Sequence, residues 1–356
     1  MKATAPKAPL DPRFAQLDAS WVDRVLRDGG HTGAPVKAVV PEPLAFGGAT
    51  TEIARLRIDY ADGEPGPASL VGKLRGQGDV HRQMEAAMGL FDREVRFYRE
   101  FAADLPIETA ALFHPGDGHK APLLLEDLAA LRPGDQAAGL SASDAEQCLD
   151  ALAALHAAHW ESPTLGSPWL TNPCEGTFRQ MTAQLMVSGI DALEAYATPS
   201  QRQQIPTDPA RWEDLIARLG EGPHTLVHND CRLDNIFFRE DGRPVIIDWQ
   251  TLAAARSSMD VANLLGGSME PDDLSASWEL LLRRYHDGLV QHGVQGYSLD
   301  ELQLHYRQNV IWPLGQGLAL IGALKGNDAR GVGPKNIARA LSHVVEVDAF
   351  AAHAEA

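Results

Sequence analysis

The alternation of apolar and polar residues in the first third of the chain predicts an antiparallel sheet. Residues 55–60 alternate with a period of two, which is typical of a half-buried strand. Residues 62–67 are rich in glycine and proline and predict a turn, because these residues supply dihedral angles that strands avoid. A second apolar strand follows at residues 68–74. We therefore expect an antiparallel meander over residues 36–74, preceded by a short helix at residues 21–27 that ends at a Gly-Gly pair.

A helical period replaces the strand pattern after residue 80. Apolar residues recur every three to four positions over residues 82–103 and predict one amphipathic helix. Glu94 lies on the apolar face of this helix. Two short apolar segments follow, at residues 110–113 and 122–125.

Beyond residue 128 the pattern is mostly helical. Ser143 and Glu146 have the spacing of a capping box and predict the start of a helix that runs to Trp160. Three short apolar runs, at residues 225–227, 236–238 and 245–247, interrupt the helical pattern. The Asp-Gly pair at residues 241–242 predicts a hairpin between the last two runs.

These elements predict an α+β chain of two lobes. We expect a flexible N-terminal arm at residues 1–20, because prolines are frequent there. An antiparallel β N-lobe with one main helix is expected at residues 21–128, and a mostly helical C-lobe with a small β insert at residues 129–356.

Composition narrows the choice of partners and compartment. The 356 residues include 48 acidic and 31 basic side chains, a formal net charge of −17. Such acidity argues against nucleic acids and anionic membranes as partners. Three widely spaced cysteines form no CxxC pair and fit a reducing compartment. No signal-like segment or membrane-length apolar run is present in the sequence, so we expect a cytoplasmic protein.

The candidate chemistry concentrates in two segments of the C-lobe. Residues 228–235 read HNDCRLDN, and residues 245–250 read VIIDWQ, so that Asp248 ends an apolar strand. A buried carboxylate is costly unless a cation or hydrogen-bond donors meet it. Asp230, Asn235 and Asp248 together are the oxygen donors that phosphoryl transfer needs, one to accept a proton and two to hold Mg²⁺.

Two other interpretations of these segments stay open. Asp230, Asp234 and Asn235 are residue types that turns favour, although this leaves Asp248 unexplained. A metal hydrolase that uses His228, Asp230 and Asp248 is a further possibility. Metal-dependent phosphatase activity without a nucleotide would favour the hydrolase.

The N-lobe has an ion pair suited to the same chemistry. Lys73 lies in an apolar strand and needs an anion, whereas Glu94 on its apolar helix face needs a cation. A strand lysine paired with a helix glutamate positions nucleotide phosphates in kinases. Glu85 and Glu100 are rival partners, and the alternative is an edge-strand lysine beside a solvated glutamate.

The segment LVHNDCRLDNIFF, followed by PVIIDWQ, resembles the small-molecule branch of the protein-kinase-like fold. That branch includes aminoglycoside phosphotransferases, choline kinases and ecdysteroid-kinase-like proteins. The resemblance implies a two-lobed kinase-like fold that uses Mg²⁺ and ATP, with GTP as the alternative nucleotide. It implies that Asp230 is the catalytic base, that Asn235 and Asp248 are magnesium ligands, and that His228 braces the loop.

The same resemblance suggests further nucleotide contacts. Gly47 and Gly48 would lie in the loop that covers the phosphates, although the segment departs from G-x-G-x-x-G and an ordinary hairpin is the alternative. Backbone groups near Glu126 and Leu128 would meet the adenine edge, unless this segment is a plain buried strand. Asp260 is expected to cap a helix and also to brace the catalytic loop.

Three other residues are assigned structural roles. His156 and His159 fall on the apolar face of the capped helix and are expected to pack there rather than bind a metal. Cys231, beside the expected base, is not expected to act as a nucleophile.

The sequence therefore predicts an ATP-dependent kinase that phosphorylates a hydroxyl group of a small molecule. The alternative is a non-catalytic nucleotide-binding protein on the same scaffold. Acceptor contacts are expected from residues 160–220 and 260–330, where the sequence does not identify the substrate.

Overall fold

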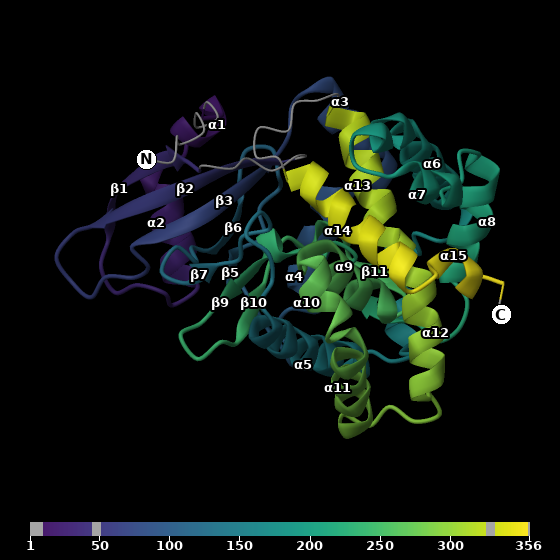
Figure 1. The fold of residues 1–356 in the computed structure, drawn as a ribbon. Coiled ribbons are helices and arrows are strands. Elements are labelled where there is room, and N and C mark those ends of the chain that lie inside the picture. The colour runs from purple at the N-terminus through teal and green to yellow at the C-terminus, as the bar shows by residue number, and fades with distance from the viewer. Residues whose placement is uncertain (1–9, 45–50, 325–331, 355–356) are drawn as a thin grey trace. The chain divides into compact units, whose positions relative to one another are not determined.

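The structure is a computed structural model in which residues 10–44, 51–324 and 332–354 are described. Its chain divides into two compact units, coloured by residue number in Figure 1. The N-terminal unit comprises Met1–Asp104, Thr109–Leu131 and Ile247–Gln250. The helical unit comprises Leu105–Glu108, Arg132–Ile246 and Thr251–Ala356.

The N-terminal unit is built on a five-stranded sheet of order β1-β2-β3-β6-β5. Neighbouring strands are antiparallel throughout, which confirms the predicted meander. Leu56 faces Leu70 across β2 and β3, and Ile53 faces Lys73. The strands are β1 (Val36–Pro43), β2 (Thr51–Tyr60), β3 (Ser69–Arg75), β5 (Leu112–His114) and β6 (Leu123–Glu126).

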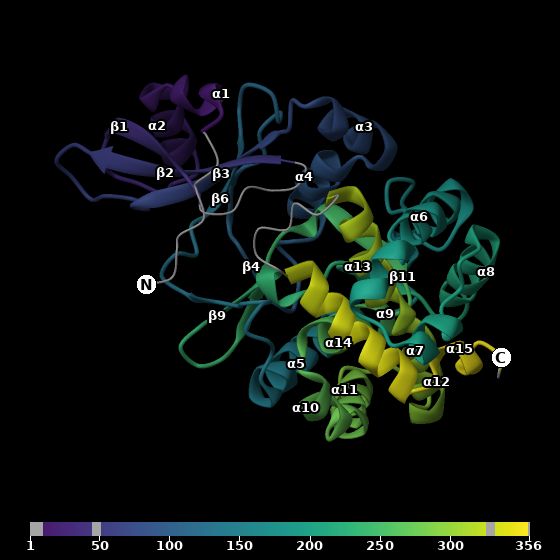
Figure 2. The same cartoon turned by 45° about the horizontal axis from the view of Figure 1, so that its top comes forward.

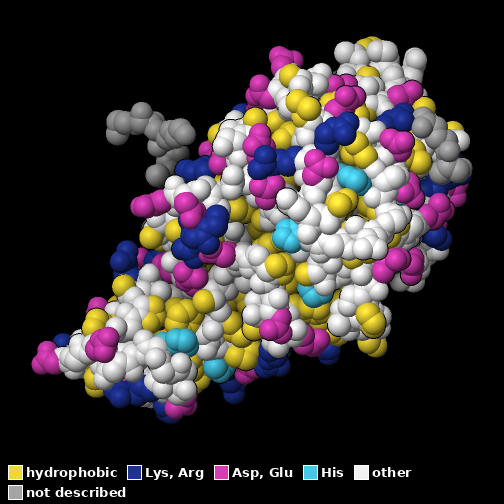
Figure 3. Space-filling model, turned by 90° about the horizontal axis from the view of Figure 1, so that it is seen from below, with side chains coloured by type: hydrophobic (Ala, Val, Ile, Leu, Met, Phe, Trp, Pro, Cys, Tyr) yellow, Lys and Arg dark blue, Asp and Glu magenta, His cyan; other side chains and the backbone are white. Residues whose placement is uncertain are grey.

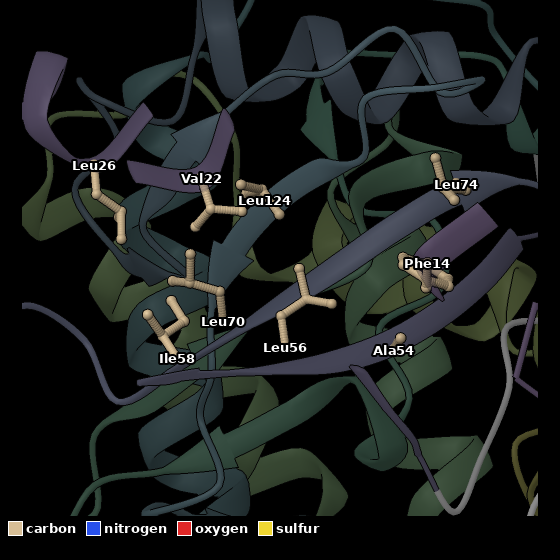
Figure 4. Close-up of a cluster of buried hydrophobic side chains, with 9 residues drawn as sticks. All are labelled: Phe14, Val22, Leu26, Ala54, Leu56, Ile58, Leu70, Leu74 and Leu124. Carbon is tan, nitrogen blue, oxygen red and sulfur yellow. The ribbon is translucent and has the colours of Figure 1, made fainter. Parts of the chain in front are cut away.

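Two N-terminal helices, α1 (Pro12–Ala15) and α2 (Ala19–Asp28), cover one face of this sheet. Phe14 of α1 lies over Gly72, where an added Cβ would come within 3.0 Å of the ring atom Cε1. Because side chains alternate along a strand, Lys73 projects from the opposite face. Figure 4 shows the apolar cluster between helices and sheet, which contains Phe14, Val22, Leu26, Ala54, Leu56, Ile58, Leu70, Leu74 and Leu124.

Residues 12–15 and 19–20 of the predicted flexible arm are instead helical, and they belong to the helices α1 and α2 that pack against the sheet. Pro12 occupies the first turn of α1, where its fixed φ suits a helix and its missing N–H is not needed. Asp11 caps this helix by accepting a hydrogen bond from the backbone N–H of Arg13 at 2.8 Å. Pro12 therefore marks the start of a helix, and the prediction of a flexible arm is wrong at this position.

The single helix predicted over residues 82–103 is two helices, α3 (Asp79–Met88) and α4 (Leu90–Glu100). Gly89 separates them at φ 59°, a left-handed conformation that glycine adopts without steric cost. Helix α4 keeps the predicted apolar stripe and buries Glu94 completely.

The helical unit begins its main part with α5 (Ala142–Ala158), and Figure 2 shows many of its helices. The N-cap of α5 is Ser141, whose hydroxyl accepts from the N–H of Asp144 at 3.1 Å. The predicted cap at Ser143 is therefore two residues late. Further helices are α6 (Gly176–Ser188), α7 (Pro199–Gln204), α8 (Pro209–Leu219), α9 (Ser258–Ser268), α10 (Pro271–Ser275), α11 (Trp278–Gln291), α12 (Leu299–Asn309), α13 (Ile311–Leu324), α14 (Val332–Glu346) and α15 (Ala349–Ala352).

Short strands lie on both sides of the loop at residues 228–235. Strand β8 (Thr225–Val227) pairs with β11 (Ala253–Ala255), and β9 (Ile236–Phe238) pairs with β10 (Pro244–Ile246) in the predicted hairpin. Strands β4 (Glu108–Thr109) and β7 (Arg132–Pro133) flank that hairpin in a sheet of order β4-β10-β9-β7. Residues 228–235 connect β8 to β9 and include the short 3-10 helix η3 (Leu233–Asn235).

Helix α9 is the innermost helix of the unit among those described. All of its residues are buried, and it packs against α5, α12, α13 and α14. Polar side chains on α9 therefore require partners within the protein. This helix carries Asp260 and Asn263.

The sheet-rich N-terminal unit and the helical unit with its small β insert confirm the predicted α+β class. None of the helices in the described ranges has the length and apolarity needed to cross a bilayer. The face of the molecule in Figure 3 carries acidic and basic side chains interspersed with one another.

Candidate active site

The loop at residues 228–235 is anchored at its start by Asp260. The carboxylate of Asp260 accepts hydrogen bonds from the backbone N–H groups of His228 and Asn229, both at 2.7 Å. Asp260 lies in the first turn of α9, but the N-cap position belongs to Ser257, so the predicted capping role is wrong. A completely buried carboxylate thus fixes the backbone immediately before Asp230.

Two buried histidines support this anchor. The ring of His228 accepts from the backbone N–H of Asp230 at Nδ1, over 3.2 Å. His156 lies with Nδ1 2.7 Å from the hydroxyl of Tyr285 and Nε2 3.3 Å from Asp260. His156 therefore packs within a hydrogen-bonded helix face, as the sequence predicted.

Asp230 and Asn235 contact each other directly. The Nδ2 of Asn235 lies 2.9 Å from the carbonyl oxygen of Asp230 and 3.0 Å from its Oδ2. Both of these atoms accept hydrogen bonds, so only the amide NH₂ can face them. The carbonyl oxygen of the Asn235 side chain consequently points away from Asp230. Arg232 donates to the same Oδ2 through Nε at 3.2 Å, which further fixes the carboxylate.

In the N-terminal unit, Lys73 contacts two carboxylates at once. Its Nζ lies 2.7 Å from Oε1 of Glu94 and 2.8 Å from Oδ1 of Asp248. Lys73 and Glu94 are both buried, and the pair that the sequence predicted is formed. We call Lys73, Glu94 and Asp248 the ion triad.

Two carboxylates and one ammonium set the electrostatics of the ion triad. Burial by itself lowers the pKa of Lys73, but the charges of Asp248 and Glu94 outweigh it and raise that pKa, so the ammonium is kept. Burial raises the pKa of Glu94, Lys73 opposes this rise and Asp248 adds to it. With Lys73 protonated, two carboxylates share one ammonium, and one negative charge remains when both are ionised.

The rival partners of Lys73 are engaged elsewhere. Glu85 forms an ion pair with Arg75 and also accepts from the backbone N–H of Phe91 at 2.9 Å. Glu100 lies on the exposed side of α4, 3.9 Å from Arg96. Burial on the apolar face therefore distinguishes Glu94 from the other two.

Asp248 is held in place by the residues that follow it. Trp249 stacks on Phe97 with ring centroids 4.1 Å apart, and its Nε1 donates to the hydroxyl of Thr109 at 3.0 Å. Asp248 itself has φ 68°, the left-handed region that non-glycine residues rarely adopt. Residues 247–250 pack with the N-terminal unit because of these contacts, and not with the helical lobe expected for residues 245–250.

The remaining predicted residues fall in different surroundings. Glu126 ends β6 and accepts through Oε2 from the backbone N–H of Ala111 at 3.1 Å, and Leu128 is buried. Gly47 and Gly48 lie outside the described residues. Cys231 is completely buried, and burial raises the pKa of its thiol well above the usual value, which disfavours a thiolate.

The side chains expected to bind magnesium fit that ion chemically. Mg²⁺ prefers hard oxygen ligands, typically one or two carboxylates completed by water and phosphate. Asp248 supplies a carboxylate that contacts Lys73. Asn235 supplies an amide oxygen that its contacts with Asp230 turn away from that residue. Neither residue offers sulfur or nitrogen ligands, which would favour zinc.

Two features of the loop were missed by sequence reasoning. Asn229 has φ 64°, and Asn is among the residue types that tolerate this conformation, so its identity was a usable signal. The completely buried Gln136 accepts from the N–H of Leu233 at 2.7 Å and donates its own backbone N–H to Asp234 at 3.1 Å. No local pattern points to Gln136, because its partners lie about a hundred residues away in the chain.

Together, the antiparallel sheet with its lysine–glutamate pair and the helical unit with its loop and hairpin define a protein-kinase-like fold. The chain belongs to the ecdysteroid kinase-like family, whose model matches residues 47–295. No curated protein matches the chain in sequence.

Solved structures of small-molecule kinases share this fold. A candidate aminoglycoside phosphotransferase from Ralstonia eutropha JMP134 is 13% identical with a TM-score of 0.57, over 95% of this chain and 98% of that one. A choline kinase from Cryptosporidium parvum is 11% identical with a TM-score of 0.56, over 95% and 96%. A spectinomycin phosphotransferase in complex with ADP and spectinomycin is 16% identical with a TM-score of 0.53, over 94% and 98%. These neighbours share the fold of this chain, and the family match supports a phosphotransferase.

Proposed function

We propose that this chain transfers the γ-phosphoryl group of ATP to a hydroxyl group of a small molecule. Asp230 accepts the proton of the attacking hydroxyl, and Asn235 and Asp248 hold Mg²⁺. The Lys73–Glu94 pair positions the nucleotide phosphates, and backbone groups near Glu126 and Leu128 meet the adenine edge. Bound Mg²⁺ supplies charge neutralisation on the phosphates.

The ion triad is the observation that carries this proposal. A buried ammonium needs one carboxylate for neutrality, yet Lys73 contacts two, at 2.7 and 2.8 Å. When both carboxylates are ionised, the remaining negative charge is unfavourable in a site of low dielectric unless a further cation compensates it. A magnesium ion carried in with ATP provides that cation, while Lys73 has three N–H donors, of which the two carboxylates engage two.

The chain's own residues prepare the acceptor step. Asn235 and Arg232 donate to Oδ2 of Asp230, which limits the rotation of the carboxylate. Asp260 and His228 fix the preceding backbone through hydrogen bonds of 2.7–3.2 Å. A carboxylate held in one orientation favours proton transfer, because the reacting atoms meet without reorganisation.

A screen of hydroxylated metabolites with ATP and Mg²⁺, read by mass spectrometry for products heavier by one phosphoryl group, tests the proposal. We expect Asp230→Asn to lower turnover by roughly 10²-fold or more, because a general base typically contributes that much. Nucleotide affinity, measured by calorimetry with Mg²⁺ and a non-hydrolysable ATP analogue, should stay within about threefold, since Asp230 is not assigned a nucleotide contact.

Asp241→Asn is the matched control. Asp241 lies in the exposed turn between β9 and β10, the hairpin that follows the loop of Asp230. This substitution should change neither quantity. Tight binding of the analogue without any phosphorylated product across a broad alcohol panel would favour the non-catalytic alternative. Equal loss of turnover and nucleotide affinity in Asp230→Asn would contradict the assignment of Asp230 as base.

A further inference from the structure

The backbone of Asn229, directly before Asp230, is in a left-handed conformation. Its φ of 64° lies in a region that glycine adopts freely, that asparagine tolerates at some cost and that other residues rarely adopt. A residue persists in such a conformation only when its surroundings fix it. The peptide that joins Asn229 to Asp230 sets the direction in which the carboxylate of Asp230 projects, so whatever fixes Asn229 also aims Asp230.

The N–H and carbonyl groups of Asn229 are both held by side chains, one from α9 and one from α13. Its N–H donates to Oδ1 of Asp260 on α9 at 2.7 Å. Its carbonyl oxygen accepts from Nε2 of Gln316 on α13 at 2.9 Å. Gln316 in turn accepts at Oε1 from Nδ2 of Asn263 at 2.9 Å. Asp260 and Asn263 are three residues apart on α9 and share a face of that helix. The three hydrogen bonds and this turn of α9 together form a closed ring through Asn229.

The chemistry of these groups fixes the orientation of both amides. A backbone carbonyl can only accept, so Gln316 must present its NH₂ group to Asn229. Its oxygen then faces Asn263, which must present its own NH₂ group. Reversing either amide would bring two acceptors or two donors together. The ring is therefore directional, with donors pointing from Asn263 toward the loop.

The setting of Gln316 indicates that this contact is specific. Helix α13 has the sequence IWPLGQGLALIGAL, in which Gln316 is the one amide among apolar residues. Asn263 is 4% exposed on a helix whose residues are all buried. Amides in such places are costly unless their hydrogen bonds are made, and here each amide makes its bond toward the loop.

We propose that Gln316 and Asn263 are positioning residues that hold the left-handed Asn229 and thereby aim Asp230. The ring Asp260–Asn229–Gln316–Asn263 supplies the contacts that hold the loop. The role in turnover rests on the proposed function, whereas the holding of the loop does not. Helix α13 also belongs to the region expected to contact the acceptor. The amide of Gln316 therefore connects this helix to the loop that carries Asp230.

The test compares Gln316→Met with the control Gln291→Met, which changes an exposed glutamine at the end of α11. Methionine keeps the length of the side chain and removes the donor. We expect Gln316→Met to lower kcat about tenfold, the effect of one lost hydrogen bond plus release of the strained backbone, with the KM for ATP within about twofold. Hydrogen exchange of the amides in residues 226–236 should accelerate by about tenfold.

A second variant separates positioning from general stability. Glycine adopts φ 64° without steric cost, so in an Asn229→Gly background the loss of Gln316 should lower kcat less than it does in the wild type. Gln316→Glu should be more harmful than Gln316→Met, because a carboxylate would face the carbonyl oxygen of Asn229. Unchanged loop exchange and unchanged kcat in Gln316→Met would overturn the proposal.

Two further outcomes are distinguishable. Equal losses of kcat from Gln316→Met in both backgrounds would show a structural role only and would also overturn the assignment. If the wild-type protein phosphorylates nothing, the proposed function fails, and the exchange rates alone decide whether the amides hold the loop.

Discussion

Replacement of Lys73 by methionine removes the one cation of the ion triad. Its Nζ lies within 2.8 Å of both carboxylates, and Glu94 is completely buried. Removal of one partner from a buried ion pair typically costs about 3–5 kcal/mol, because the other charge stays buried without compensation. We expect a loss of this size in the free energy of unfolding at pH 8.

The loss should depend on pH. Burial already raises the pKa of Glu94, and the opposing effect of Lys73 disappears in the variant, so this pKa rises further above its unfolded value of about 4.3. A carboxyl group with a raised folded pKa contributes stability that is complete below the unfolded pKa and is lost as pH rises through the folded pKa. The variant should therefore be least impaired at acid pH, with a slope of about 1.4 kcal/mol per pH unit while Glu94 titrates.

Urea unfolding monitored by circular dichroism between pH 5 and pH 8 measures this difference. The control is Arg57→Met, which breaks an exposed pair with Glu42 across β1 and β2 and should cost about 1 kcal/mol or less at every pH. Lys73→Met combined with Glu94→Gln should lose most of the pH dependence. A cost for Lys73→Met that is equal at pH 5 and pH 8 would refute the assignment of a buried, ionised Glu94.

Three further substitutions test other parts of the structure. Gly72→Ala should lower stability by about 1–3 kcal/mol in a thermal melt, because the added Cβ meets the Phe14 ring at 3.0 Å, and Phe14→Leu should recover part of the loss. Asp260→Ala should cost about 2–5 kcal/mol in urea, since two buried N–H groups lose their acceptor. Burial lowers the pKa of His305 to about 4, so its contribution to stability is complete above pH 6.5 and is lost as pH falls toward 4. His305→Gln should flatten the decline in urea midpoint over that range.

Elements with strong local signals were predicted correctly from the sequence. The period-two alternation predicted β2, the apolar run at residues 68–74 predicted β3, and the Asp-Gly pair predicted the β9–β10 hairpin. The errors arose where two local interpretations were equally good. Ser141 and Ser143 each precede an acidic residue by three positions, and the structure starts α5 after the first. Pro12 suited both a loose arm and a helix start, and the packing of Phe14 on Gly72 decides between them.

The ion pair of the candidate site was predictable because each partner interrupts an apolar pattern. Lys73 and Glu94 stand out for that reason, and they are only 21 residues apart. The contact of Lys73 with Asp248 spans 175 residues and left no local trace. Gln316 also interrupts an apolar helix, so the same rule would have marked it, but its partner is a backbone carbonyl that no residue type reveals.

Charged and amide groups in apolar elements serve the two units in different ways. Glu94 in α4 and Lys73 in β3 attract each other over distance, so small displacements weaken their contact gradually. Gln316 in α13 and Asn263 in α9 act through hydrogen bonds, which weaken steeply once their direction changes. Charges therefore suit the proposed nucleotide site, which must adapt to its ligand, whereas amides suit the loop that carries the proposed base. If this distinction holds, neutral isosteres should impair nucleotide binding when placed at Lys73 and turnover when placed at Gln316.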